Sequence, residues 1–498
     1  MQHLLLNDLI IHASNKFKRN VFIEDIDKSF TFEETINAAS YYCNIIRDEI
    51  KEYGDNVKIV IKAEQELEFI PIFLGVILAG CAAIPFNPSL PEDGVEYYMK
   101  ETGAYFLIKK DGETYFLQNG NKKVYFSKIE TAKNVFSTRL SNYIKPKQTS
   151  DDIAMIIFTS GSTGLPKGVV SFHRHVTFVL SSLHAALDYF ESDKIFIGIP
   201  FSFDYGLYQV FLCLMFGSSL FISKSGGTGL TLFKELVQSN ATVLPAVGPM
   251  FDNLEYFCKK NPSSLNKLRL ITNTGAHIPE KTIQSIRSRL ENINIQLMYG
   301  LTECKRVSIS PPNADLIKPN TCGLPLPLTE VYILDDNDNE APVGEIGQIV
   351  IKGSHIMAGY WKDDTQTNSK FRRFNSTETK LYTGDYGKKD KDGYLFWIGR
   401  KDDIYKQNGF RVSASEIEES ALSLDTISLA VVLPYGFRDK STLFYKGDAS
   451  VENVKEFLYS KIERHKLPFK IIKVADFKLT HNGKIDKKWL LNLTNEME

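Results

Sequence analysis

The first part of the chain alternates short apolar runs with segments whose apolar residues recur at helical spacing. The runs at residues 58–61, 105–108 and 153–158 predict buried strands, because they are short and rich in β-branched or aromatic side chains. Residues 69–81 predict a buried helix between two of them. This alternation predicts an α/β domain whose strands are mostly parallel.

The alternation continues through the middle of the chain. The further candidates are strands at residues 194–200, 219–222, 241–244 and 268–272, and a helix at residues 208–215. From about residue 331 the strands follow one another closely, at 331–334 and 347–351, which predicts a β-rich subdomain. The polar turn between them, residues 335–339, favours a solvated hairpin over a calcium site, because the EF-hand glycine and terminal glutamate are missing.

The two ends of the chain add helices. Residues 1–17 predict an amphipathic helix and not a signal peptide, because no basic segment precedes the apolar residues. Thr31 followed by Glu34 predicts a capping box at a helix start. After a candidate boundary at residues 399–403, the pattern predicts a helix at 413–422, a strand at 429–433 and a helix at 451–462. We therefore expect a large domain at residues 1–400 and a small α+β domain at residues 401–498.

Composition excludes several classes of protein. The 498 residues are 43% apolar and 24% charged, with a formal net charge of −1, so no overall field attracts nucleic acid or an anionic membrane. The most apolar stretch, residues 69–85, is too short for a membrane span. The six cysteines form no CxxC pair, which predicts reduced thiols and a cytoplasmic protein. For Cys304, a buried inert thiol is favoured over a reactive one.

Residues 159–168 read TSGSTGLPKG and follow a predicted strand directly. Glycines let a backbone turn sharply, and exposed N–H groups, hydroxyls and a lysine together bind anions, so the loop predicts a polyphosphate site. A flexible linker is the alternative, but linkers are not flanked by buried strands. A mononucleotide P-loop needs Ser or Thr after its lysine, whereas Gly168 follows Lys167.

Four later stretches also carry chemistry. Residues 274–276 (TGA) allow close backbone approach to a flat ring. Residues 299–303 (YGLTE) offer an aromatic ring, a hydroxyl and a carboxylate that can hold Mg²⁺. Residues 382–385 (YTGD), with GR at 399–400, offer an acceptor for ribose hydroxyls. Residues 482–486 (NGKID) place a lysine near the end of the sequence; taken singly, each stretch also fits a turn or a solvated surface.

Together and in this order, the five stretches resemble the adenylate-forming superfamily, which includes acyl-CoA synthetases, adenylation domains of nonribosomal peptide synthetases, and luciferases. The resemblance covers essentially the whole chain and implies a large domain of several mostly parallel α/β layers with a β-rich subdomain, followed by a small mobile α+β domain. It implies that the ATP phosphates are held by Thr159, Ser160, Gly161, Ser162, Thr163, Gly164 and Lys167. It implies adenine and ribose contacts from Thr274, Gly275, Ala276, Tyr299, Asp385 and Arg400.

The resemblance also implies the catalytic groups. Thr302 meets phosphate, Glu303 binds Mg²⁺, and Lys484 neutralises charge where the carboxylate meets the α-phosphate. Asp402 falls at the hinge, and Gly409, in KQNGFR, lies beside the thiol channel. The implied reaction joins a carboxylate to AMP with release of pyrophosphate, after which a thiol displaces AMP.

The substrate is indicated by residues 200–208, which resemble the FDxS stretch of amino-acid-activating domains. There Asp204 pairs with the substrate ammonium; the alternative is that Asp204 caps a helix starting at Tyr205. The expected pocket residues are Asp204, Tyr205, Tyr208, Val247, Asn273, Met298 and Arg306. Arg306 departs from the family's small or apolar residues and either reads a second polar group or braces the pocket. The two tyrosines predict a small amino acid such as proline or alanine.

The acceptor is expected to be the phosphopantetheine thiol of a separate carrier protein, because the printed sequence runs only fourteen residues beyond Lys484. Two alternatives stay open at this point. One is an acyl-CoA synthetase that uses coenzyme A, and the other is a non-catalytic nucleotide-binding homologue, which the presence of Lys484 and Glu303 disfavours.

Overall fold

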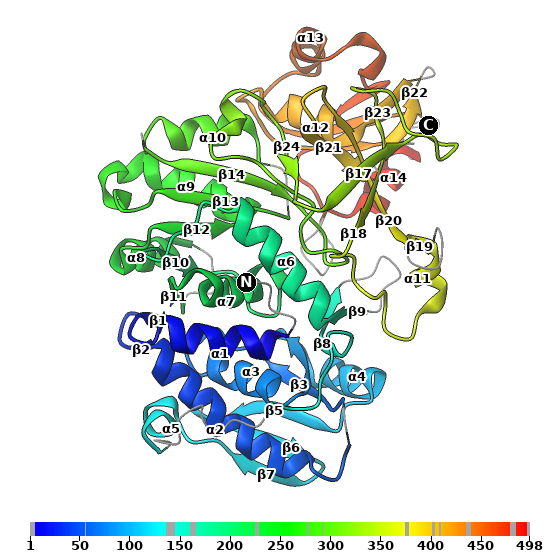
Figure 1. Cartoon of the computed structure of the whole chain (residues 1–498). Helices are drawn as coiled ribbons and strands as arrows, with labels where there is room; N and C mark the ends of the chain where they lie inside the picture. The colour runs from blue at the N-terminus through cyan, green and yellow to red at the C-terminus, as the bar shows by residue number, and fades with distance from the viewer. Residues whose placement is uncertain are drawn as a thin grey trace. The chain divides into compact units, whose positions relative to one another are not determined.

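The structure is a computed structural model and describes residues 5–54, 56–135, 145–159, 166–224, 229–275, 278–290, 292–373, 378–400, 404–407, 410–434, 440–478 and 485–495. The chain divides into two compact units (Figure 1). The larger unit consists of Met1–Glu330 with Ile351–Leu381, and the smaller unit consists of Val331–Val350 with Tyr382–Glu498. The domain boundary at residue 400 remains a prediction, and residues 401–403 lie outside the described residues.

A nine-stranded sheet forms one half of the larger unit, in the order β16-β15-β14-β13-β12-β10-β11-β1-β2. The bounds are β1 (Val21–Glu24), β2 (Ser29–Thr31), β10 (Lys194–Ile197), β11 (Ser219–Ile222), β12 (Val243–Ala246), β13 (Leu270–Asn273), β14 (Asn294–Tyr299), β15 (Ser308–Ile309) and β16 (Leu324–Pro325). The strands from β14 to β1 pair in parallel. Their buried, mostly apolar residues match a sheet that is covered on both faces.

A seven-stranded sheet forms the other half, in the order β7-β6-β5-β3-β4-β8-β9. The bounds are β3 (Lys58–Lys62), β4 (Ala82–Phe86), β5 (Phe106–Asp111), β6 (Thr114–Asn119), β7 (Lys122–Tyr125), β8 (Ile153–Thr159) and β9 (Lys167–Phe172). The strands β5, β3, β4 and β8 are parallel, and antiparallel pairs close both edges.

The helices of the larger unit are α1 (Leu6–Lys16), α2 (Phe32–Ile50), α3 (Phe69–Leu78), α4 (Glu92–Thr102), α5 (Ile129–Val135), α6 (His173–Ala186), α7 (Asp204–Phe216), α8 (Gly229–Ser239), α9 (Gly248–Lys260), α10 (Glu280–Arg287) and α11 (Asp364–Lys370). Helices α1, α2 and α3 pack on one another (Figure 1). All ten residues of α3 are buried. Gly75 allows this packing, because a Cβ there would lie 2.9 Å from the Ala39 carbonyl oxygen of α2.

The smaller unit contains β21 (Leu395–Arg400), β22 (Ile404–Gln407), β23 (Phe410–Ser413), β24 (Ile427–Leu433), β25 (Thr442–Gly447) and β26 (Lys470–Lys473), with helices α12 (Ala414–Leu422), α13 (Val451–Lys461) and α14 (Lys487–Asn495). Strands β17 (Thr329–Leu334), β18 (Gly347–Gly353) and β20 (Thr379–Lys389) begin in one unit and end in the other, and β19 (Phe371–Arg373) pairs with β20. The β24-β25-β26 sheet and the helices α12, α13 and α14 give the smaller unit the α+β composition that the sequence predicts.

The sequence predictions agree with these elements, with shifted ends. The Thr31–Glu34 capping box is present at the start of α2. Helix α7 starts four residues before the predicted residue 208, and strands β12 and β13 start two residues later than predicted. Asp335 closes the polar turn after β17 by accepting backbone hydrogen bonds from Asn337 and Asn339.

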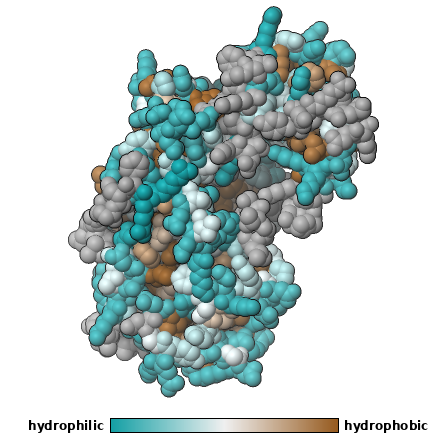
Figure 2. All heavy atoms as spheres, turned by 90° about the vertical axis from the view of Figure 1, so that its right-hand side faces the viewer, coloured by the Kyte–Doolittle hydropathy of each residue, from teal (hydrophilic) through white to brown (hydrophobic). Residues whose placement is uncertain are grey.

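The surface visible in Figure 2 is largely hydrophilic, with scattered hydrophobic patches. Across the described residues, no helix combines the length and the apolar character needed to cross a bilayer.

Candidate active site

The predicted phosphate loop joins two paired strands. Strands β8 and β9 are antiparallel, and their register sets Thr159 opposite Lys167. The loop therefore leaves and re-enters the same edge of the seven-stranded sheet. Ser160, Gly161, Ser162, Thr163 and Gly164, which the sequence assigns to phosphate, lie outside the described residues.

Tyr360 connects this hairpin to the predicted magnesium carboxylate. The Lys167 ammonium donates to Gln366 Oε1 and lies 6.0 Å from the centre of the Tyr360 ring. The Tyr360 hydroxyl donates to Glu303 Oε1 at 2.5 Å. Lys167 and Glu303, which are far apart in the sequence, are thus both brought close to Tyr360, one near its ring and the other at its hydroxyl.

The carboxylate of Glu303 is buried and ionised. Burial opposes its ionisation, but the charge of Lys370 and the hydrogen bonds from Tyr360 and Lys370 outweigh that effect, so the pKa of Glu303 lies below its ordinary value. The Lys370 ammonium lies 3.1 Å from Oε1, the same oxygen that Tyr360 uses. An ionised carboxylate with its contacts concentrated on Oε1 fits the oxygen ligand that Mg²⁺ requires.

Three neighbouring strands deliver the predicted adenine and pocket residues to one edge of the nine-stranded sheet. The registers of β12, β13 and β14 align Ala246 with Asn273, and Asn273 with Leu297. Because these strands are parallel, the residues at their carboxyl ends come together, at the edge where α/β proteins bind ligands. The residues so placed are Val247, Asn273, Thr274, Gly275, Met298 and Tyr299. Gly275 has φ +87°, which few other residues adopt, and Ala276 lies outside the described residues.

Residues 301–306 form a tight turn between β14 and β15. The Lys305 amide donates to the Leu301 carbonyl at 2.7 Å, and Lys305 has φ +64°. Thr302 is partly exposed, whereas Glu303, Cys304, Lys305 and Arg306 are all buried. Burial raises the pKa of Cys304 well above that of an ordinary thiol, so Cys304 is an inert thiol, as the sequence favoured.

Helix α7 presents the residues expected to bind the substrate. Asp204 is its first residue and Phe203 is its N-cap, so Asp204 does not cap the helix. The Asp204 side chain is 20% exposed, and its Oδ2 lies 3.8 Å from the Lys305 ammonium. Tyr205 and Tyr208 are buried on the same helix, and the Tyr205 hydroxyl shares a 2.8 Å hydrogen bond with Thr272 on β13. The structure thus brings Asp204 and both tyrosines together with the turn.

In the smaller unit, the predicted ribose residues are direct partners. The register of β20 and β21 pairs Asp385 with Arg400, and the Arg400 Nε lies 2.9 Å from Asp385 Oδ1. Thr383 accepts a hydrogen bond from the Asp385 amide at 3.0 Å, which fixes the turn at Gly384. Asp402, Gly409 and Lys484, which the sequence assigns to the hinge, the thiol channel and catalysis, lie outside the described residues.

Sequence reasoning missed four residues of this site: Tyr360, Gln366, Lys370 and Lys305. The first three come from the segment between β18 and β20, which carries no motif identified in the sequence. Lys305 had a signal, since it stands beside Arg306 in the stretch that departs from the family pattern.

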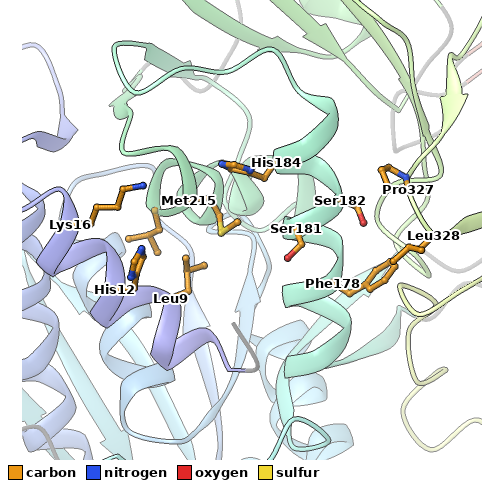
Figure 3. Close-up of a pocket in the computed structure, with 11 residues that line it drawn as sticks. Leu9, His12, Lys16, Phe178, Ser181, Ser182, His184, Met215, Pro327 and Leu328 are labelled. Atoms are coloured by element: carbon orange, nitrogen blue, oxygen red, sulfur yellow. The ribbon is translucent and has the colours of Figure 1, made fainter. Parts of the chain in front are cut away.

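A separate pocket of about 480 Å³ lies in the larger unit (Figure 3). Its lining includes His12 and Lys16 of α1, Phe178 of α6, Met215 of α7, and Leu328. It shares no lining residue with the site above.

Comparison with known proteins identifies the family. The AMP-binding enzyme family matches residues 11–361. The chain belongs to this family. This membership confirms the adenylate-forming superfamily that the five sequence motifs predicted. Bacitracin synthase 1 of Bacillus licheniformis is 28% identical over 478 residues, which cover 94% of this chain but only 9% of that protein.

Several solved structures share the fold. ATP-bound MatB from Rhodopseudomonas palustris aligns with a TM-score of 0.79 over 99% of both chains, at 20% identity. VinN aligns with a TM-score of 0.68 at 28% identity, over 79% of this chain and 98% of that one. A second VinN structure, a complex with L-aspartate, aligns with a TM-score of 0.67 at 27% identity. These likenesses confirm the α/β fold class.

Proposed function

We propose that this chain activates a small amino acid as its acyl-adenylate and passes it to the phosphopantetheine thiol of a carrier protein. The observation that carries the proposal is the position of Asp204. This carboxylate starts α7, caps nothing and remains partly exposed next to two buried tyrosines. A carboxylate facing an organic pocket is costly unless a cation meets it, and the ammonium of an amino acid supplies one.

The remaining residues fit the two half-reactions. In the first, a substrate carboxylate oxygen attacks the α-phosphorus of ATP and pyrophosphate leaves. Lys167 and Thr302 bind the phosphates, Glu303 holds Mg²⁺, and Lys484 stabilises charge at the reacting oxygens. Mg²⁺ supplies charge neutralisation on the phosphates. In the second, a thiolate attacks the acyl carbon and AMP leaves as a thioester forms.

The nucleoside is assigned to two groups of residues. Thr274 and Gly275 follow β13 and Tyr299 ends β14, at the carboxyl edge of these parallel strands, and the three residues contact the adenine. In the smaller unit, the Asp385 carboxylate accepts hydrogen bonds from the ribose hydroxyls, and Arg400 orients this carboxylate. Movement of the small domain about Asp402 gives the two half-reactions their separate arrangements, with Gly409 beside the thiol.

Pyrophosphate exchange tests the substrate class. The purified protein with MgATP is assayed with a panel of amino acids and fatty acids, and exchange is expected with amino acids. Asp204→Asn is expected to reduce exchange by about 10²-fold, because the ammonium then loses its charged partner. Glu280→Gln, an exposed carboxylate in the first turn of α10, serves as the matched control and leaves exchange unchanged. Exchange with fatty acids alone overturns the proposal in favour of an acyl-CoA synthetase.

The acceptor and the catalytic lysine are tested separately. Labelled amino acid is offered with either coenzyme A or a phosphopantetheinylated carrier protein, and label on the carrier is expected. Lys484→Ala is expected to lower adenylate formation by at least about 10²-fold. A protein that binds ATP yet forms no adenylate with any acid would instead be the non-catalytic homologue.

A further inference from the structure

Two cations are buried side by side at the turn after β14. The side chains of Lys305 and Arg306 belong to residues that are only 2% and 6% exposed. Lys305 also holds a left-handed backbone, which is unfavourable for a lysine by about 1 kcal/mol or more. Gly300 lets the turn close, since a Cβ there would lie 2.2 Å from the Lys305 carbonyl oxygen. We call Lys305 and Arg306 the cation pair.

The guanidinium of Arg306 is held in place but not satisfied. Its Nη1 donates to Thr274 Oγ1 at 3.2 Å and to the Lys305 carbonyl at 2.8 Å. The group lies 4.8 Å from the centre of the Tyr205 ring. Its Nε is buried and has no hydrogen-bond acceptor within the described parts of the chain. The arginine is therefore oriented by neutral groups, and no carboxylate among the described residues pairs with it.

The ammonium of Lys305 is in a similar position. It lies 3.8 Å from Asp204 Oδ2 and 5.9 Å from the Tyr208 ring centre, yet it donates no hydrogen bond to any described residue. The Tyr208 hydroxyl beside it is also buried without a hydrogen-bond partner among those residues. Burial lowers the pKa of Lys305, while the charge of Asp204 opposes that shift. A pair that existed only to neutralise Asp204 would be expected to close to hydrogen-bonding distance.

Two other arginines of the larger unit, in contrast, have carboxylate partners. Arg287 donates to both carboxylate oxygens of Asp315, at distances from 2.8 to 3.2 Å. Arg269 reaches Asp188 and Asp193 in the same way. Buried donors without acceptors are costly, so they are retained where a ligand supplies the acceptor.

We propose that the substrate is an amino acid with a second acidic group, and that the cation pair binds this group while Asp204 binds the ammonium. This inference rests on the proposed adenylation activity. It favours amino dicarboxylic acids of the aspartate and glutamate class over proline or alanine. One carboxylate reacts with ATP, and the other accepts hydrogen bonds from Lys305 and Arg306, in a bidentate arrangement that suits a guanidinium.

A comparison of acids with their amides tests the charge alone. Pyrophosphate exchange is measured with aspartate, asparagine, glutamate, glutamine, alanine and proline. The preferred acid is expected to exceed its amide by about 10²-fold in kcat/KM, because the amide has the same shape but leaves the cations unbalanced. Asparagine, alanine or proline reacting as well as aspartate and glutamate overturns the inference. Absence of exchange with every acid instead overturns the adenylation proposal.

Variants test the cation pair directly. Lys305→Gln and Arg306→Gln are each expected to lower the acid-to-amide ratio by at least about tenfold. This ratio does not depend on the fraction of protein that is folded. Arg289→Gln, which removes an arginine that donates hydrogen bonds to Ser285 and Ser288, is the matched control and keeps the ratio. If both rates fall in parallel in the cation-pair variants and the ratio is unchanged, the cations brace the fold and the inference is wrong.

Discussion

Glu303 and the cation pair stand on opposite sides of Cys304, and all three charges are buried. The carboxylate of Glu303 receives hydrogen bonds from Tyr360 and Lys370. Lys305 and Arg306 keep donors for which the described residues offer no acceptor. The described residues therefore supply hydrogen bonds to Glu303 Oε1, whereas they supply none to Lys305 Nζ and Arg306 Nε. Replacing a charged group that has its partners within the protein should lower the stability of the fold. Replacing a group whose partner is a ligand should leave the stability of the free protein nearly unchanged or raise it.

The largest difference is expected between two arginines. Arg287→Met breaks a partly buried bidentate pair and leaves the buried Asp315 uncompensated, which costs up to about 3–5 kcal/mol in the free energy of unfolding. Arg306→Met removes a guanidinium that no described carboxylate balances, so it should change stability by less than about 1 kcal/mol. Urea unfolding of both variants measures the difference. Equal losses would show that Arg306 is as well satisfied by the protein as Arg287.

The next largest effect is expected for the Glu303 carboxylate, which is proposed to hold Mg²⁺. Glu303→Gln keeps the size of the side chain but removes the charge, so adenylate formation should fall by about 10²-fold or more, with a higher Mg²⁺ requirement. Tyr360→Phe, which removes the hydrogen bond to Oε1 and keeps the aromatic ring, should cost far less. Pyrophosphate exchange across a Mg²⁺ titration measures both. An unchanged Mg²⁺ requirement in Glu303→Gln would remove this residue from the metal site.

Replacement of Lys305 should stabilise the free protein. Lys305→Met keeps an unbranched side chain and removes a buried ammonium without a hydrogen bond, so we expect a gain of about 1–2 kcal/mol. Lys370→Met should have the opposite sign, because it takes a cation from the buried Glu303 carboxylate. Thermal melting without ligands compares the two. Destabilisation by Lys305→Met would indicate that its contact with Asp204 already stabilises the fold.

Two buried histidines extend the comparison to pH. Burial lowers the pKa of both His173 and His355 to about 4. His173 Nδ1 accepts a hydrogen bond from the Leu6 amide, whereas both ring nitrogens of His355 are buried without hydrogen bonds to the described residues. The unfolded chain binds protons near pH 6.5 and the folded chain does not, so stability falls as the pH drops from about 6.5 towards 4.

His355→Leu should remove part of this acid sensitivity, about 1.4 kcal/mol at about one pH unit below the unfolded pKa. It should cost little near pH 8, because no described hydrogen bond is lost. His173→Leu should also reduce the loss of stability at low pH. It should lower the free energy of unfolding at every pH, because the Leu6 amide loses its hydrogen-bond acceptor. Melting curves between about pH 5 and 8 distinguish the two variants. An unchanged acid slope in His355→Leu would show that this ring does not remain neutral on folding.

Local patterns predicted much of the fold. The capping box at Thr31, the strands that flank the phosphate loop, and the buried helix α3 all depend on neighbours within a few residues. The patterns located the ends of elements less accurately. Helix α7, for example, extends four residues further towards the N-terminus than its apolar pattern indicates. Tertiary packing sets such ends, because a helix continues while its first turn finds contacts.

The sequence predicted only part of the candidate site. Motif residues such as Thr159, Glu303 and Asp385 stand out because their chemistry and order match the superfamily. Tyr360 and Lys370 do not, because a tyrosine or lysine in an unremarkable segment gains its role from a partner dozens of residues away. The sequence marked Arg306 as an unusual residue, but it could not show that no described carboxylate pairs with it.

By itself, the sequence determined the superfamily, the order of the nucleotide motifs and the main strands and helices, because these depend on residue type and short spacing. Only the tertiary structure decided that Tyr360 joins the β8–β9 hairpin to Glu303, and that the cation pair is buried with donors for which the described residues offer no acceptor. Burial and hydrogen-bond satisfaction depend on every element packed around a side chain, and no short stretch of sequence contains that information.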